Sequence, residues 1–421
     1  MLETLTIGKD AVAVSDIFNG GAPRLQRLFL VSFYSPMCMS ALRGETISEL
    51  ALEVERLDWN RFHDGLHGLK KTLKTLSVNA FFILVHRNPP CPVEFTQLNT
   101  LSLRGYDPDI FRVLDSIRIP LTTRVEVAIW DNPRPVPLQR FGFDYAFKAI
   151  STCRSVDLEP RSLVLSRGEP YLDSRVATLF RLRAWVNQPS SCPPHGLVPS
   201  ETCLISVASI ADDRWDKLYD HPGPPFSISA GWSLPLPGMS LAHLESMCLQ
   251  HTQGTGDIPL ANDFWDDLSR LPNLSALSVR TYDVSSLLKQ LNADSLFIEK
   301  TIGLQAEASM PSQSSSPENP DSASNQQPQY RRRFQSLKSL CFDGRDFDPS
   351  YSWCDFTSES FFETVRKNSR LRHRLGSDST LRAMSFLEWE CVPEGWSEEF
   401  SQFVSDIESY GVTLRFEPEG Q

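Results

Sequence analysis

The chain has 421 residues with 41 basic and 52 acidic side chains, so its formal net charge is 41 − 52 = −11 with histidine neutral. Its 41% hydrophobic and 22% charged residues are close to the globular average, which excludes a wholly disordered chain. The acidic balance disfavours a nucleic-acid partner, because such binding depends on neutralising phosphates. No apolar run reaches the ~18 residues that a membrane span requires, so we expect no membrane partner.

The cysteines and the N-terminus indicate where the protein resides. The nine cysteines form no CxxC pairs, and the chain reaches Glu3 and Asp10 without the apolar segment of a secretory signal. Disulfides are rare in reducing compartments. We therefore expect reduced thiols and an intracellular location, in the cytoplasm or the nucleus.

The pattern apolar-x-x-apolar-x-apolar recurs in the first third of the chain. Its copies are Leu2, Leu5, Ile7; Leu25, Leu28, Leu30; Ile47, Leu50, Leu52; Leu73, Leu76, Val78; Leu98, Leu101, Leu103; and the weaker Thr122, Val125, Val127. They begin at positions 2, 25, 47, 73, 98 and 122, so the steps are 23, 22, 26, 25 and 24 residues. All five steps lie within the roughly 20–29 residues of a leucine-rich repeat.

The same unit returns further along the chain with looser spacing. Its later copies are Leu163 and Leu165; Leu179 and Leu182; Leu244, Met247 and Leu249; Leu274, Leu277 and Val279; Leu337, Leu340 and Phe342; Leu381, Met384 and Phe386; and Val412, Leu414 and Phe416. Amphipathic periodicity between them predicts helices over 143–151, 263–271, 358–371 and 397–410. Asn262 or Asp263 can cap the second of these helices, and Ser397 the last.

These units predict an α/β fold, an irregular, right-handed leucine-rich-repeat solenoid shaped like the ribonuclease-inhibitor horseshoe, with parallel strands on its concave face. One unit cannot bury its own apolar edge, so neighbouring units must stack. We expect the solenoid to span 1–305, a disordered Ser/Pro/Gln-rich insertion to follow at 306–330, and further repeats to occupy 331–421. The repeat assignment is weakest over 187–240. The alternative is a set of unrelated amphipathic strands in an ordinary α/β domain.

Several runs resemble the F-box and leucine-rich-repeat proteins of mushroom-forming fungi. These runs are LETLTI, NGGAPRLQRLFL, LRGETISELAL, LKTLSV, LNTLSLRG, RSLVLS, FRLRAW and LPNLSALSV. The resemblance implies that the repeats hold a protein target, like the substrate receptors of ubiquitin ligases. An F-box would dock on a cullin ligase through the adaptor Skp1. We can place no F-box before the first repeat, so we expect that contact only if an F-box lies upstream.

In this architecture the outward residues of consecutive strands form one concave, ladder-like surface. The mixed charges of that surface favour a folded protein partner, whose identity the sequence does not reveal. Arginine and tryptophan dominate the energetics of interfaces. The predicted partner-binding residues are Phe29, Arg104, Arg124, Glu126, Arg181, Arg183 and Trp185. The alternative for each is an ordinary solvated strand residue, and Trp185 could instead belong to the core.

The sequence gives little support to catalysis or to a cofactor. His63 and His67 are spaced to share a helix face, but no third metal ligand is evident, so we interpret them as ordinary surface histidines. No GxSxG motif occurs, and Cys91, Cys192 and Cys203 lack a neighbouring histidine signature. We therefore expect a protein that is not an enzyme. The alternative function is a hydrolase or metal-binding protein on a repeat scaffold.

Two basic clusters are open to two interpretations. Arg331, Arg332 and Arg333 form one, and Arg366, Lys367, Arg370, Arg372 and Arg374 form the other. Either could be a nuclear import signal or an anion contact. We favour charges that complement the negative C-terminus of a helix or solvate its exposed face.

Overall fold

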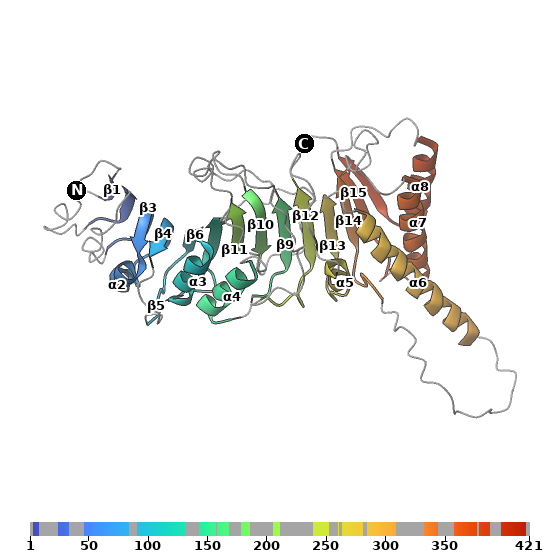
Figure 1. The fold of residues 1–421 in the computed structure, drawn as a ribbon. Coiled ribbons are helices and arrows are strands. Elements are labelled where there is room, and N and C mark those ends of the chain that lie inside the picture. The colour runs from blue at the N-terminus through green and yellow to red at the C-terminus, as the bar shows by residue number, and fades with distance from the viewer. Residues whose placement is uncertain are drawn as a thin grey trace, which may run out of the picture.

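The structure is a computed structural model of the 421-residue chain. It describes residues 3–7, 24–32, 46–83, 91–130, 143–156, 158–167, 178–185, 205–210, 239–251, 260, 263–280, 284–308, 332–343, 358–376, 379–387 and 397–417. These residues form an α/β structure built on one long, mostly parallel sheet of 14 strands (Figure 1). A second, two-stranded sheet pairs β5 (Val93–Glu94) with β7 (Ile117–Arg118).

The strands of the long sheet are β1 (Thr4–Ile7), β2 (Arg27–Ser32), β3 (Glu49–Asp58), β4 (Thr75–Ile83), β6 (Thr100–Tyr106), β8 (Arg124–Trp130), β9 (Ser162–Arg167), β10 (Thr178–Trp185), β11 (Ile205–Ile210), β12 (Ser246–His251), β13 (Ala276–Arg280), β14 (Ser339–Asp343), β15 (Ala383–Leu387) and β16 (Thr413–Glu417). The helices are α2 (Trp59–Leu69), α3 (Asp107–Asp115), α4 (Phe143–Arg154), α5 (Phe264–Ser269), α6 (Val284–Ala308), α7 (Ser358–Leu375) and α8 (Ser397–Ser409). The four predicted helices are confirmed, whereas α2, α3 and α6 were not predicted.

The predicted register of the N-terminal leucines is confirmed. Strands β1, β2, β3, β4, β6 and β8 are adjacent and parallel in that order. Their second apolar positions are paired across the sheet: Leu5, Leu28, Leu50, Leu76, Leu101 and Val125. Leu5 is half-buried at the edge of the sheet, and the other five are buried. Each strand therefore covers the apolar flank of its neighbour.

The turn before each of these strands also pairs with the turn of the preceding unit. The Ser48 N–H donates to the Gln26 carbonyl at 2.8 Å, and the Lys74 N–H donates to the Ser48 carbonyl at 2.8 Å. The Asn99 N–H continues the series to the Lys74 carbonyl at 2.7 Å. These bonds satisfy backbone groups between buried leucines, so the repeat extends beyond the strands themselves.

The middle of the sheet departs from the predicted order. We expected the units at Leu163 and Leu179 to continue one parallel series, and this prediction is wrong. The order is β8-β11-β10-β9-β12, and β10 is antiparallel to both of its neighbours. Antiparallel neighbours need no crossover helix, so the chain can run back along β10 after β9, and β11 then pairs in parallel with β8. The inward row nevertheless continues through Ile205, Ala184 and Leu163.

Strands β12 to β16 are again parallel and consecutive. The inward positions of the last three strands form a ladder of stacked phenylalanine rings: Phe342 and Phe386 have ring centroids 5.7 Å apart, and Phe386 and Phe416 have centroids 5.4 Å apart. Phe361 of α7 and Phe403 of α8 are buried against the same core. Figure 1 shows α6, α7 and α8 gathered at this end of the sheet.

The first residues of the predicted disordered insertion are helical. Residues 306–308 still belong to α6, and residues 309–331 lie outside the described part of the chain. The sheet is continuous across this stretch, because β13 pairs directly with β14 in parallel register. The units before and after the predicted insertion therefore share one sheet.

A buried ion pair joins α6 to α7. The Arg372 Nη2 lies 2.6 Å from the Asp294 Oδ2, and both side chains are almost inaccessible to solvent, at 1% and 0%. Asn368 donates to the same carboxylate oxygen at 3.2 Å, and the Arg333 N–H donates to the Asp294 Oδ1 at 3.0 Å. Arg372 also donates to the Phe334 carbonyl at 2.9 Å. The network fixes the chain just before β14 onto both helices.

This geometry changes the interpretation of the second basic cluster. Arg372 is buried, Arg366 pairs with Asp406 at 2.9 Å, and Lys367 pairs with Glu299 at 3.3 Å. An import receptor needs accessible side chains, so the cluster as a whole does not fit that role. Its position near the end of α7 matches the favoured interpretation only for the exposed Arg370 and Arg374.

Replacing an inward leucine should destabilise the protein far more than replacing its outward neighbour. We expect Leu101→Ala to lower the free energy of unfolding by about 2–5 kcal/mol, because it leaves a cavity in the core. Ser102→Ala, one residue along the same strand, should change it by less than about 0.5 kcal/mol. Urea unfolding followed by circular dichroism measures both. Equal effects would contradict the inward and outward assignment.

Removing one partner of the buried ion pair should also be costly. Asp294→Ala leaves the Arg372 charge buried, so we expect a loss of about 3–5 kcal/mol in the free energy of unfolding. The matched control is Glu299→Ala, which removes the half-exposed Lys367 pair and should cost below ~1 kcal/mol. Chemical denaturation compares the two variants. A small effect of Asp294→Ala would show that water reaches the pair.

Candidate functional site

The outward positions of the first six strands form the most accessible polar surface of the described sheet. We call this set the N-terminal outer face, which comprises Thr4, Thr6, Arg27, Phe29, Glu49, Ala51, Glu53, Thr75, Ser77, Asn79, Thr100, Ser102, Arg104, Arg124 and Glu126. All are exposed or half-exposed, whereas their inward neighbours make up the main core. Four of the predicted partner-binding residues lie here: Phe29, Arg104, Arg124 and Glu126.

The strand register places these side chains in rows that cross the strands. One row runs Thr6, Phe29, Ala51, Ser77, Ser102, Glu126. A second row, on one side of it, contains Arg27, Glu49, Thr75, Thr100 and Arg124. A third row, on the other side, contains Glu53, Asn79 and Arg104. Because adjacent strands are ~4.8 Å apart, neighbours within a row can contact one ligand together.

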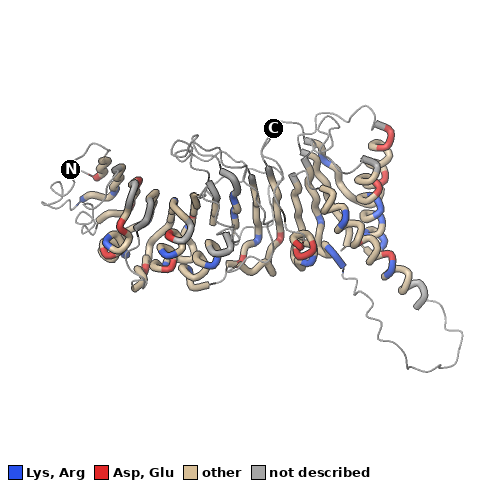
Figure 2. Tube along the Cα trace, in the orientation of Figure 1, with Lys and Arg blue, Asp and Glu red and all other residues tan. Residues whose placement is uncertain are grey.

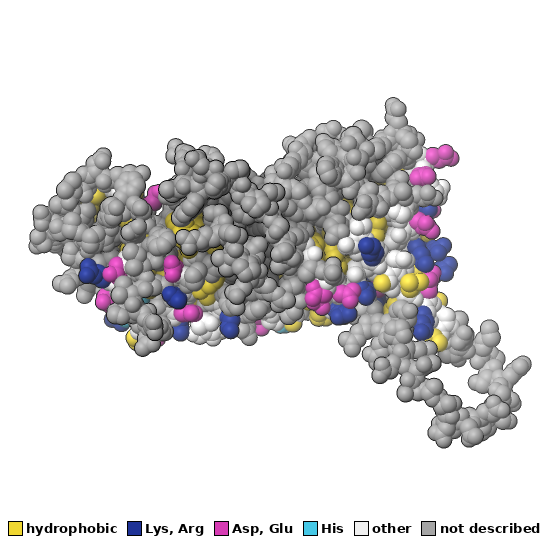
Figure 3. Space-filling view, in the orientation of Figure 1, with side chains coloured by type: hydrophobic (Ala, Val, Ile, Leu, Met, Phe, Trp, Pro, Cys, Tyr) yellow, Lys and Arg dark blue, Asp and Glu magenta, His cyan; other side chains and the backbone are white. Residues whose placement is uncertain are grey.

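The charges of the N-terminal outer face are balanced. Three arginines, Arg27, Arg104 and Arg124, accompany three glutamates, Glu49, Glu53 and Glu126. Arg27 pairs with Glu49 across β2 and β3 at 3.2 Å, with side chains 56% and 35% exposed. An exposed pair of this kind contributes little stability, so a partner can replace it at small cost. Figure 2 shows acidic and basic residues near one another along the backbone trace, and Figure 3 shows their side chains on one face of the molecule.

The other three predicted partner-binding residues are buried, which corrects their expected exposure. Arg181 and Arg183 are each 7% exposed, and Trp185 is 2% exposed. Trp185 packs with Val164 and Cys248 in a small apolar cluster, so the alternative of a core residue is the correct one. Ala128, Trp130 and Ala208 form a second such cluster, against which Tyr106 packs. The central strands are therefore buried on both faces.

A sequence signal for this double burial exists. A strand buried on both faces contains a continuous apolar run, whereas a half-buried strand alternates. Val127, Ala128, Ile129 and Trp130 form such a run in β8, and Leu163, Val164 and Leu165 form another in β9. Alternation is kept over residues 75–79 of β4 and in the first part of β6, where Ser77 and Ser102 lie between buried residues. The accessible face accordingly ends at β8.

The histidine pair of α2 is divided between core and surface. His67 is exposed as predicted, but His63 is buried at 1% exposure, which corrects the interpretation of both as surface residues. The His63 Nε2 lies 3.2 Å from the Ser116 carbonyl, which can only accept, so Nε2 carries the proton. Burial lowers the pKa of His63 below its ordinary 6.5, and the Ser116 bond only partly opposes that effect. The imidazole is thus a neutral structural group.

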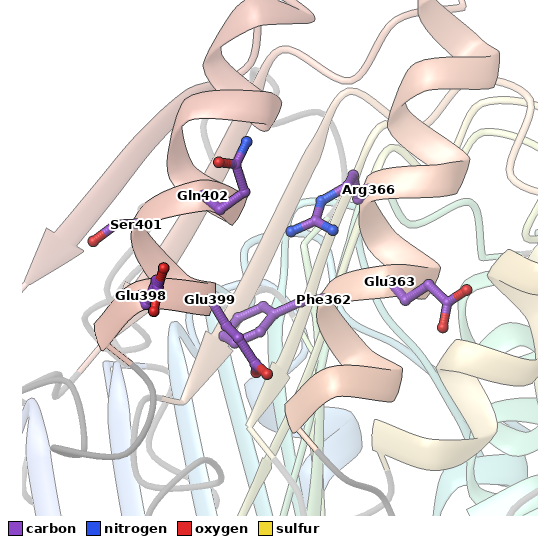
Figure 4. A pocket seen from close by; sticks show the side chains of 7 residues that line it. All are labelled: Phe362, Glu363, Arg366, Glu398, Glu399, Ser401 and Gln402. Carbon is purple, nitrogen blue, oxygen red and sulfur yellow. The ribbon is translucent and has the colours of Figure 1, made fainter.

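A groove between α7 and α8 is a second candidate site. Its volume is about 830 Å³, and its lining residues are Phe362, Glu363, Arg366, Glu398, Glu399, Ser401 and Gln402. Figure 4 shows Phe362 and Arg366 pointing from α7 toward α8. Arg366 is paired with Asp406, and Glu398 and Glu399 lie in the first turn of α8, where acidic side chains stabilise the helix. These contacts explain the groove as helix packing.

The remaining candidates for chemistry have structural explanations. Among the residues that the structure describes, no three His, Cys, Asp or Glu side chains group closely enough to hold a metal ion. Burial raises the pKa of the Cys153 thiol to about 12, which keeps it protonated at neutral pH. Cys91 is exposed, and Cys192, Cys203 and Arg331 lie outside the described residues. No helix within the described ranges is both long and apolar enough to cross a membrane.

No family model, no curated protein and no solved structure matches this chain. The site is therefore interpreted from its own geometry.

The buried His63 predicts a specific pH dependence of stability. Because its pKa is lowered in the folded protein, the unfolded chain binds the proton more tightly. Its contribution is fully present above the unfolded pKa of about 6.5 and is lost as pH falls toward the folded value. We expect His63→Gln to flatten the fall in the free energy of unfolding between roughly pH 7 and 5. The exposed neighbour provides the control, since His67→Gln should retain most of that slope; identical slopes for wild type and His63→Gln would contradict the assignment.

Proposed function

We propose that this chain is a non-catalytic scaffold for protein recognition, an irregular leucine-rich-repeat solenoid that holds a partner on its N-terminal outer face. The observation that carries the proposal is the parallel pairing from β1 to β8, which leaves the residues of the N-terminal outer face accessible and places their inward neighbours in the core or packed against it. The strands of this surface are already paired with one another, so little backbone ordering entropy is lost on association.

The composition of this face supports binding rather than catalysis. Its side chains are arginine, glutamate, serine, threonine, asparagine, alanine and one phenylalanine. Serine and threonine are weak nucleophiles unless a base lies beside them, and this face holds no histidine or cysteine. Mixed charges suit a protein partner, because they select its orientation and disfavour a polyanion.

The resemblance to F-box and leucine-rich-repeat proteins extends the proposal. It makes this chain similar to the substrate-binding repeats of a ubiquitin-ligase adaptor that acts inside the cell. Contact with Skp1 and the cullin ligase requires an F-box upstream of the repeats, so we propose that contact only for a chain that carries one.

Bulky charges in the middle of the N-terminal outer face should abolish partner capture. We expect the double variant Ser77→Arg/Ser102→Arg to reduce recovery of a specific partner at least about tenfold, because the arginines occupy adjacent positions of one row. Affinity purification from the native cells, quantified by mass spectrometry against wild type, measures the loss.

The matched control is Lys71→Arg/Glu94→Lys, which makes the same change of +2 in net charge at exposed positions away from this face. This control should recover the partner as wild type does. All variants should have the same circular dichroism spectrum and thermal midpoint. A partner recovered equally by wild type, by the control and by the double variant would contradict the proposed surface.

A further inference from the structure

We infer that the occupant of the N-terminal outer face is an extended peptide segment that carries a Lys or Arg over Glu53 and an Asp or Glu over Arg124. The inference rests on the proposed function and specifies the partner for the same surface.

Within the described residues, the N-terminal outer face is smaller than a standard interface between two folded proteins. Six strands at ~4.8 Å spacing are about 24 Å wide. From the row of Arg27 and Glu49 to the row of Glu53 and Arg104, the face extends over about 13 Å of strand. This corresponds to roughly 300–500 Å², whereas a standard interface buries ~800 Å² on each partner. The buried centre of the sheet adds nothing to this area, since Ala128, Arg183 and Trp185 are inaccessible. An area of this size matches a short peptide segment.

The floor of this face favours an extended chain over a helix. Apart from Arg104, the outward side chains of β4 and β6 on this face are small and polar: Thr75, Ser77, Asn79, Thr100 and Ser102. Hydroxyl and amide groups both donate and accept hydrogen bonds, as the free backbone of an extended peptide requires. A helix satisfies its own backbone and binds through an apolar groove, which this floor does not supply.

The charged groups define where the segment carries its complementary charges. Glu53 on β3 is in register with Asn79, then Arg104, then Ala128 on β8. Arg124 precedes Ala128 by four positions on that strand, since 128 − 124 = 4. Three strand spacings combined with four residues of strand place the two charges about 19 Å apart, which an extended peptide crosses in roughly six residues. The line between them crosses the small polar floor.

The test is selection of a phage library of random linear peptides on the purified full chain. We expect enriched peptides to share a basic and an acidic residue roughly six positions apart. A synthetic, fluorescein-labelled peptide of that sequence should lose about tenfold in affinity with Glu53→Gln or with Arg124→Gln, measured by fluorescence anisotropy.

A charge exchange provides the decisive comparison. On the variant Glu53→Arg/Arg124→Glu, selection should enrich peptides with the two charges in reversed order, and the reversed synthetic peptide should recover the lost affinity. The matched control Lys71→Glu/Glu94→Lys, which exchanges two exposed charges elsewhere, should select the original sequence. Equal thermal midpoints establish that the variants are folded.

The remaining outcomes separate this inference from the proposed function. Enrichment of peptides that lack the paired charges would contradict the stated peptide chemistry. Enrichment of the same peptides on wild type and on Glu53→Arg/Arg124→Glu would contradict it too. In another outcome, the library yields no enriched peptide, but a cellular partner binds the wild type and is lost from Ser77→Arg/Ser102→Arg. This outcome would contradict the extended peptide as the ligand and would still support the proposed recognition scaffold. Failure of both experiments would overturn both.

Discussion

The structure depends on inward apolar side chains that repeat at the spacing of parallel strands. Leu76 and Val78 point to the same side of β4, and a single strand could not bury them by itself. Pairing Leu76 with Leu50 and Leu101 places each leucine between two others. Because the side-chain period of a strand is two, this same alignment also orders the outward residues into rows. The core and the binding surface thus have one geometric cause.

The sheet is divided by what lies on its outward face rather than by its core. The inward rows run without a break from β1 to β16. The outward face changes along the same length: it is polar and accessible as far as β6 and the first positions of β8, and apolar and buried around Val164, Trp185 and Cys248. An antiparallel β10 lies in this buried section. The interruption of the regular order coincides with the limit of the accessible surface.

Charged residues have opposite roles at the two ends of the molecule. The Arg372 and Asp294 side chains are buried and hydrogen-bonded to several groups, so their pairing fixes the relation of α6, α7 and the start of β14. The Arg27 and Glu49 side chains are solvated, so their pairing constrains the fold little and leaves them available to a partner. Burial, and not the identity of the residues, decides which role a charge has.

The sequence by itself determined the strands of the N-terminal repeats, their parallel register and the outward positions of Phe29, Arg104, Arg124 and Glu126. It could do so because alternation and a step of 22 to 26 residues are local patterns that stacking reproduces directly. Tertiary structure decided the reversed order of β9, β10 and β11, the burial of Arg181, Arg183 and Trp185, and the pairing of Arg372 with Asp294 across 78 positions of sequence. Each of these features depends on which distant segment of the chain packs against the residue. A local repeat pattern carries no information about such long-range contacts.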